Sequence, residues 1–147
     1  MLEVPKVIKI ISTLGLLPFL FGAIASLQLS LIQDYLNKFF LSLSILYAAL
    51  ILSFLGGCLF GFECLNKSMP NIKRAWIAIV PTIWALLALQ ITNFSASILA
   101  VGFLIVYEFD RKAYSHGTVP GWWLSLRLPL TAIVILSLSI IGFSHES

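Results

Sequence analysis

The sequence predicts an all-α integral membrane protein, a bundle of five transmembrane helices with the N-terminus cytoplasmic and the C-terminus on the opposite side. The 147-residue chain is 60% hydrophobic and 10% charged, whereas about a quarter of the residues in an ordinary globular domain carry charge. Long uncharged stretches alternate with short polar segments, and the basic residues gather in every second polar segment. We expect residues 1–147 to form a single transmembrane domain.

The uncharged stretches set the number of spans. A helix that crosses a bilayer needs about 20 mainly apolar residues. The first two spans are expected at 8–31 and 39–62, and the last at 128–143. The uncharged run from Ala75 to Tyr107 is too long for one straight span and tight for two. The polar residues around Asn93 predict a turn there, with short spans at 75–91 and 95–109.

The basic residues predict the orientation, because positively charged loops are retained on the cytoplasmic side during insertion. If the run from Ala75 to Tyr107 were a single helix, the nine Lys and Arg residues would divide five against four. Two helices place only Lys38 outside. The eight basic residues then expected inside are Lys6, Lys9, Lys67, Lys73, Arg74, Arg111, Lys112 and Arg127.

A cleavable secretion signal is the competing interpretation of the N-terminus. Two lysines, an apolar stretch and Ala23-Ile24-Ala25 before Ser26 resemble such a signal. Apolar residues continue to Ile32, however, so we expect the first helix to be retained.

Small residues predict how the helices pack, because helices in lipid associate through close contact of their backbones. Ala49, Ser53, Gly57 and Gly61 recur every four residues and form a predicted packing stripe. We expect it to pack inside the bundle rather than at a dimer seam, with Gly22 and Ser26 of the first span as possible neighbours. Prolines in the spans tend to bend helices. Among Pro18, Pro81 and Pro129, the bend is expected mainly at the more central Pro18, whereas Pro81 lies near the first turns of its helix and is expected to bend it little.

Charged side chains end or open four spans at one expected depth. These residues are Glu63, Arg74, Asp110 and Arg127. The ordinary interpretation is snorkelling side chains and weak surface ion pairs. The alternative is a partly buried pair of Asp110 and Arg127 that joins spans four and five or receives a lipid headgroup, since guanidinium suits carboxylate and phosphate. Trp122 and Trp123 fit an interfacial aromatic belt.

Residues that would indicate catalysis are missing. The middle of each predicted span lacks charged residues, which weighs against a pump or a proton-coupled carrier. No phosphate-binding loop, zinc-protease motif or nucleophile elbow occurs. Cys58 and Cys64 are expected to be free thiols, and His116 and His145 are isolated. We therefore predict no enzyme activity, no cofactor and no metal site, and we expect no nucleic-acid partner because the excess positive charge belongs to the loops.

Four segments in matching order resemble a family of small polytopic membrane proteins of unknown function, found in proteobacteria and in a mitochondrial transmembrane protein. The segments are 15–19, 47–57, 80–84 and 122–131. Members often have a polar or basic residue and then Trp before the glycine that matches Gly61, where this chain has Leu59 and Phe60. The resemblance implies an integral protein of an inner membrane and implies no activity.

Two functions remain open from the sequence. The first is a non-enzymatic accessory, assembly or scaffolding component of a complex in a bacterial or mitochondrial-type inner membrane, in contact with lipid and with other membrane proteins or copies of itself. The second is a small oligomeric transporter or a binder of lipid or quinone-like molecules. A cavity lined by Tyr47, Trp84 and Gln90 would favour the second.

Overall fold

The structure is a computed structural model that describes residues 3–27, 34–65 and 71–146. These residues contain no β-strand. Within these described ranges, five segments are long and apolar enough to cross a membrane, the number predicted from the sequence. Residues 28–31 of the expected first span, with Gln28, and Lys67 lie outside the described residues. The helices are α1 (Lys6–Leu14), α2 (Leu17–Ser26), α3 (Asp34–Cys64), α4 (Ile72–Gln90), the short 3-10 helix η1 (Thr92–Phe94), α5 (Ser95–Ser115) and α6 (Trp123–Glu146).

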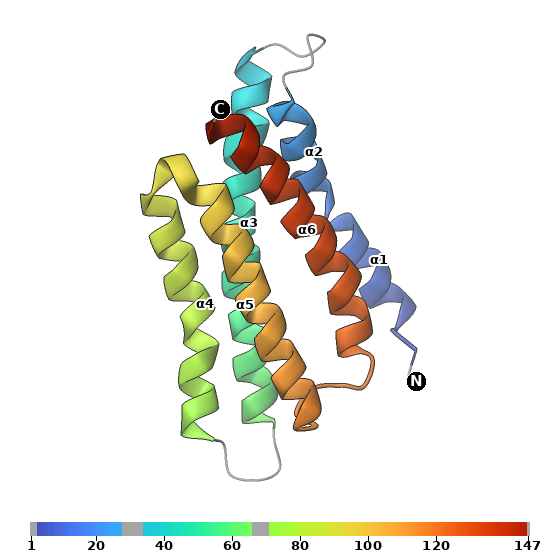
Figure 1. Ribbon diagram of the computed structural model, residues 1–147. Helices are drawn as coiled ribbons and strands as arrows, with labels where there is room; N and C mark the ends of the chain where they lie inside the picture. The colour runs from blue at the N-terminus through green and yellow to red at the C-terminus, as the bar shows by residue number, and fades with distance from the viewer. Residues whose placement is uncertain (1–2, 28–33, 66–70, 147) are drawn as a thin grey trace.

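The long helices form an elongated bundle whose members run in alternating directions (Figure 1). Helices α4 and α6 begin at the end where α3 and α5 finish, and α1 starts toward that same end. The C-terminus lies at the opposite end. We call the end with the starts of α4 and α6 the basic end, because the described chain places Lys73, Arg74, Arg111, Lys112 and Arg127 there by their positions in these helices.

The first span is two helices rather than one bent helix. Helix α1 ends at Leu14, and the Leu16 amide donates to the Thr13 carbonyl in a tighter turn before α2 begins. Pro18 falls in the first turn of α2, a position that tolerates proline because no amide partner is needed there. In place of the expected bend at Pro18, the chain ends one helix at Leu14 and begins another at Leu17.

Helices α4 and α5 form the expected pair joined by a tight turn. Asn71 caps the start of α4, where its side chain accepts from the Lys73 amide at 3.0 Å. Pro81 lies in the interior of α4 because the helix begins at Ile72, before the expected start at Ala75. The Trp84 indole of α4 donates across to the Ile98 carbonyl of α5 at 2.8 Å. This bond fixes α4 against α5.

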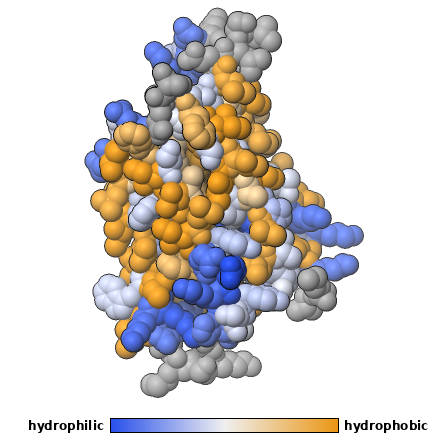
Figure 2. Space-filling view, in the orientation of Figure 1, coloured by the Kyte–Doolittle hydropathy of each residue, from blue (hydrophilic) through white to orange (hydrophobic). Residues whose placement is uncertain are grey.

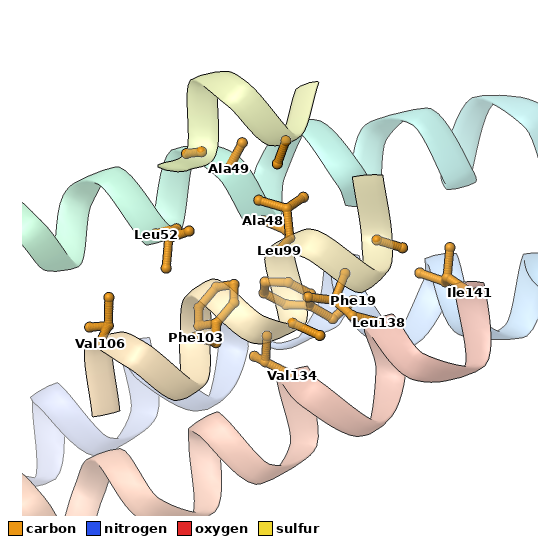
Figure 3. Packing of buried hydrophobic residues seen from close by; sticks show 14 of the residues in the cluster. Phe19, Ala48, Ala49, Leu52, Leu99, Phe103, Val106, Val134, Leu138 and Ile141 are labelled. Atoms are coloured by element: carbon orange, nitrogen blue, oxygen red, sulfur yellow. The ribbon is translucent and has the colours of Figure 1, made fainter. Parts of the chain in front are cut away.

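The apolar core is formed by α2, α3, α5 and α6, with Ala85 and Ala88 of α4 packed into it (Figure 3). Phe19 stands at its centre and meets the rings of Tyr47 and Phe103 edge to face, with centroids 5.4 and 6.2 Å apart. Close helix contact accompanies this packing. A side chain at Gly22 would collide with Ser44 of α3, so Gly22 lies against the second span but beside Ser44 and not beside a residue of the predicted stripe. The buried Ser26 hydroxyl donates to its own helix at the Ala23 carbonyl.

The surface is apolar along the length of the bundle and polar toward its ends (Figure 2). Exposed apolar side chains occur on every long helix, among them Leu50 and Phe54 of α3 and Leu86 and Leu87 of α4. Such an arrangement suits a bundle whose outer surface faces lipid, since lipid does not penalise exposed apolar groups.

Candidate functional site

The four charged residues predicted at one depth form two separate ion pairs at the basic end. Asp110 pairs with Arg127 between α5 and α6, and Glu63 pairs with Arg74 between α3 and α4. Both carboxylates are buried, with side-chain exposures of 1% for Asp110 and 5% for Glu63. The arrangement fits the alternative of a buried pair better than snorkelling side chains.

The Asp110 carboxylate receives two charge-assisted hydrogen bonds from α6. Arg127 Nε donates to Oδ2 at 2.8 Å, and Trp123 Nε1 donates to Oδ1 at 2.8 Å. Trp123 and Arg127 lie four residues apart, so they share one face of α6. Hydrogen bonds to an ionised group are shorter and stronger than neutral ones. The three side chains therefore hold the end of α5 against the start of α6.

The short connection between α5 and α6 sets up this pairing. Gly117 has a φ of 68°, a left-handed conformation that costs glycine little. The amide and the hydroxyl of the next residue, Thr118, both donate hydrogen bonds to the Ala113 carbonyl, at 3.1 and 2.9 Å. The chain thus reverses tightly, and α6 starts beside the end of α5.

One donor of Arg127 is left over. Its Nη2 atom and the Thr131 hydroxyl are buried and have no hydrogen-bond partner among the described residues. Both residues line a cavity of about 200 Å³ between the α1–α2 junction, α3, α5 and α6. Tyr47 lines the same cavity, whereas Trp84 donates to Ile98 and Gln90 is exposed. Tyr47 is therefore the single member of the predicted trio found in this cavity.

The second pair is looser on its basic side. Glu63 Oε1 accepts from the Asn71 amide at 2.8 Å, and Arg74 Nη1 lies 3.8 Å from Oε2. The Arg74 side chain is 35% exposed. A pocket of about 210 Å³ adjoins this pair, which we call the α3–α4–α5 pocket; it is lined by Leu59, Phe62, Glu63, Arg74, Ile77, Ala78, Phe109, Lys112, Ala113, His116 and Thr118.

Only the first two residues of the predicted packing stripe, Ala49 and Ser53, pack inside the bundle. Ala49 is buried, and the Ser53 hydroxyl lies 3.0 Å from the Thr82 hydroxyl of α4. A side chain at Gly57 or Gly61 would meet no described atom within 4 Å. Positions four apart advance about 40° around a helix with 3.6 residues per turn, so the row rotates about 120° from Ala49 to Gly61. The row therefore starts in the core and ends on the surface.

Gly56 makes the close approach instead. A Cβ atom there would lie 2.5 Å from the Ala78 carbonyl oxygen of α4. This glycine belongs to the face of α3 that α4 covers, and it is buried.

Trp122 and Trp123 are half-buried and have different contacts. Their rings lie 6.0 Å apart, and Trp123 also meets Phe62 of α3 at 4.9 Å. Helix α6 begins at Trp123, before the expected start of the last span at 128. Sequence reasoning missed the bond from Trp123 to Asp110, although the four-residue spacing to Arg127 was a usable signal.

Other reactive side chains stay apart in the described ranges. Cys58 and Cys64 are free thiols, as expected. No group of three or more His, Cys, Asp and Glu side chains comes together in the part of the chain that the structure describes.

Comparison with known proteins places the chain in a family. No curated protein and no solved structure matches it. A family model described as "Protein of unknown function (DUF3429)" matches residues 4–142, nearly the whole chain. The chain therefore belongs to the DUF3429 family of proteins of unknown function.

Proposed function

We propose that the protein is a non-enzymatic accessory, assembly or scaffolding component of a larger membrane complex. The membrane is of the bacterial inner or mitochondrial inner type, with the basic end on the cytoplasmic or matrix side. The charge distribution supports this orientation, because the described Lys and Arg residues at helix ends lie at the basic end except for Lys38 in the first turn of α3. No nucleic acid and no cofactor takes part.

The exposed face of α3 is the observation that carries the proposal. Gly57 has open space around it on a helix face that otherwise presents large apolar side chains such as Leu50 and Phe54. Where lipid is the neighbour, small residues bring no advantage; where another helix is the neighbour, they let two backbones approach. Since a side chain at Gly57 or Gly61 would meet no described atom within 4 Å, we assign this face to a partner protein.

Native-gel electrophoresis of the tagged chain, after mild solubilisation of its native membranes, tests the proposal. We expect migration in an assembly larger than a homodimer, and loss of that assembly in Gly57→Leu. The matched control is Ala132→Leu, which places the same leucine side chain at an exposed position of α6. Migration of the wild-type chain only as a monomer or homodimer would contradict the proposal.

A lipophilic ligand is the second candidate function, and the cavity beside Arg127 favours it. Asp110 already neutralises Arg127, so an anion there would leave the buried group with excess negative charge. The leftover Arg127 and Thr131 donors suit a neutral carbonyl oxygen on an apolar body, such as a quinone. Small-molecule sites are typically apolar with a few polar groups.

Binding of a short-chain alkyl benzoquinone to the purified protein, followed by quenching of tryptophan fluorescence, tests this candidate. We expect saturable binding that Thr131→Val weakens about three- to tenfold, the loss typical of one hydrogen bond. Thr13→Val, at an exposed position of α1, is the control. Equal binding by both variants would remove the cavity from consideration.

A further inference from the structure

The α3–α4–α5 pocket combines apolar walls with a cationic rim. All three helices contribute to its apolar walls, which include Leu59 and Phe62 of α3, Ile77 of α4 and Phe109 of α5. The rim carries Arg74, Lys112 and His116. An occupant that matches both parts has an anionic head and an apolar tail.

The charges at the rim are not balanced within the described chain. Among the described residues, Glu63 is the only carboxylate that lines the pocket, and its oxygens already accept from the Asn71 amide and face Arg74. Lys112 is exposed, and its ammonium group has no hydrogen bond or ion pair with any described residue. Arg74 and Lys112 are two cations beside the single carboxylate of Glu63. The rim therefore has an unmatched positive charge.

Arg111, the residue before Lys112, shows that the unmatched positive charge belongs to the pocket and not to the whole end of α5. Arg111 does not line the pocket, and its Nη1 atom lies 3.0 Å from Glu108 Oε1 in an exposed pair. Two adjacent cations thus have opposite situations: Arg111 has a carboxylate beside it, and Lys112 faces an apolar pocket.

The depth of the pocket identifies the occupant. Arg74 is in the first turn of α4 and Lys112 in the last turn of α5, so the rim lies where the apolar length of the bundle gives way to its basic end. The wall residue Ile77 is 41% exposed, and the pocket thereby continues into the apolar outer surface of α4. Basic pockets between spanning helices at this level bind the headgroups of anionic lipids.

We propose that the α3–α4–α5 pocket binds an anionic phospholipid, with its phosphate between Arg74 and Lys112 and an acyl chain along Ile77 and Phe109. A free phosphate would leave the apolar walls unfilled. A zwitterionic lipid would bring its own cation next to Arg74 and Lys112. The anionic lipid matches walls and rim together.

The test uses the purified full-length protein in neutral detergent, titrated with phosphatidylglycerol and, in parallel, with phosphatidylcholine and inorganic phosphate. Native mass spectrometry counts bound lipid, and thermal unfolding reports stabilisation by a ligand that binds the folded state. We expect retention and stabilisation with phosphatidylglycerol alone. Equal effects of the two lipids, or an equal effect of phosphate, would overturn the proposal.

Paired variants locate the site. Lys112→Gln removes the unmatched cation and is expected to weaken phosphatidylglycerol binding about fivefold, the loss typical of one basic residue near a lipid surface. Arg111→Gln removes an equal charge one residue away and is expected to leave binding unchanged. Ala113→Leu fills the pocket from a half-buried position and is expected to reduce binding without any change of charge. Equal losses in the two charge variants, or full binding by Ala113→Leu, would contradict the assignment.

The result is independent of the accessory role. Lipid binding is measured on the isolated chain, whereas the accessory role is measured by assembly size in native membranes. Each can fail while the other stands.

Discussion

Arg127 at the start of α6 is joined to Asp110 at the end of α5 by a 2.8 Å hydrogen-bonded ion pair from which solvent is almost excluded. Removing charges from water is costly, and in a buried pair the mutual attraction and added hydrogen bonds offset that cost. The Trp123 indole supplies one such hydrogen bond. The pair matters most when one partner is lost, since the other charge is then buried alone.

Arg127→Ala is expected to lower the free energy of unfolding by about 3–5 kcal/mol, because Asp110 stays buried without its cation. Folded yield in membranes and thermal stability in detergent measure the loss. Arg111→Ala, which breaks the exposed pair with Glu108, should change stability by less than about 1 kcal/mol. Unchanged yield and stability in Arg127→Ala would remove the pair from the account.

Trp123→Phe keeps an aromatic ring against Phe62 but removes the donor to Asp110. The expected cost is about 1.5–3 kcal/mol, as for a hydrogen bond to a charged group. Trp122→Phe is the matched control, because no hydrogen bond from the Trp122 indole is found among the described residues. Thermal unfolding of the two variants side by side checks the difference; equal stability would mean that the Asp110 bond contributes nothing.

Adjacent glycines of α3 should respond in opposite ways to the same change. Gly56→Ala is expected to destabilise the protein, because the new methyl group would press on the Ala78 carbonyl. Gly57→Ala places its methyl in open space and should be neutral or stabilise the helix by about 0.5–1 kcal/mol. Chemical or thermal unfolding in detergent compares them. A larger loss in Gly57→Ala would show that the α3–α4 contact is placed wrongly.

The contact between Ser53 of α3 and Thr82 of α4 provides a second test of the α3–α4 packing. Ser53→Ala removes one of two hydroxyls that lie 3.0 Å apart, and hydrogen bonds between spanning helices contribute about 0.6 kcal/mol on average. In a double-mutant cycle with Thr82→Val, we expect a coupling energy of that size. A coupling energy of zero would show that the hydroxyls do not interact.

The number of spans and the depth of the charged residues could be predicted from the sequence. Most of the contacts between helices could not. Charge balance divided the run from Ala75 to Tyr107 and the polar residues around Asn93 marked the turn, and the structure turns at η1 within it. The depth of Glu63, Arg74, Asp110 and Arg127 followed from their places at span ends. The Asp110–Arg127 pair was one of the alternatives from the sequence, but the pairing of Glu63 with Arg74 was not, because several charges share that depth and only the packing of α3 to α6 selects the partners.

Rotation around the helix axis explains why only part of the predicted stripe from Ala49 to Gly61 packs inside the bundle. A four-residue repeat resembles a straight stripe in the sequence, but the drift per step moves Gly57 and Gly61 away from the face that holds Ala49. Gly56 is the residue whose angle suits α4. The start of α6 shows a different limit: the expected span began at 128, just after the charged Arg127, whereas the helix begins at Trp123 and includes that charge.

Reporter fusions at the two chain ends test the central claim, which is that five helices cross the membrane with the basic end inside. An enzyme reporter active only outside and a fluorescent reporter active only inside are each fused before residue 1 and after residue 147. The account predicts the N-terminal fusion inside and the C-terminal fusion outside. Both ends in one compartment would contradict it, because an even number of crossings cannot hold all five apolar helices in the bilayer.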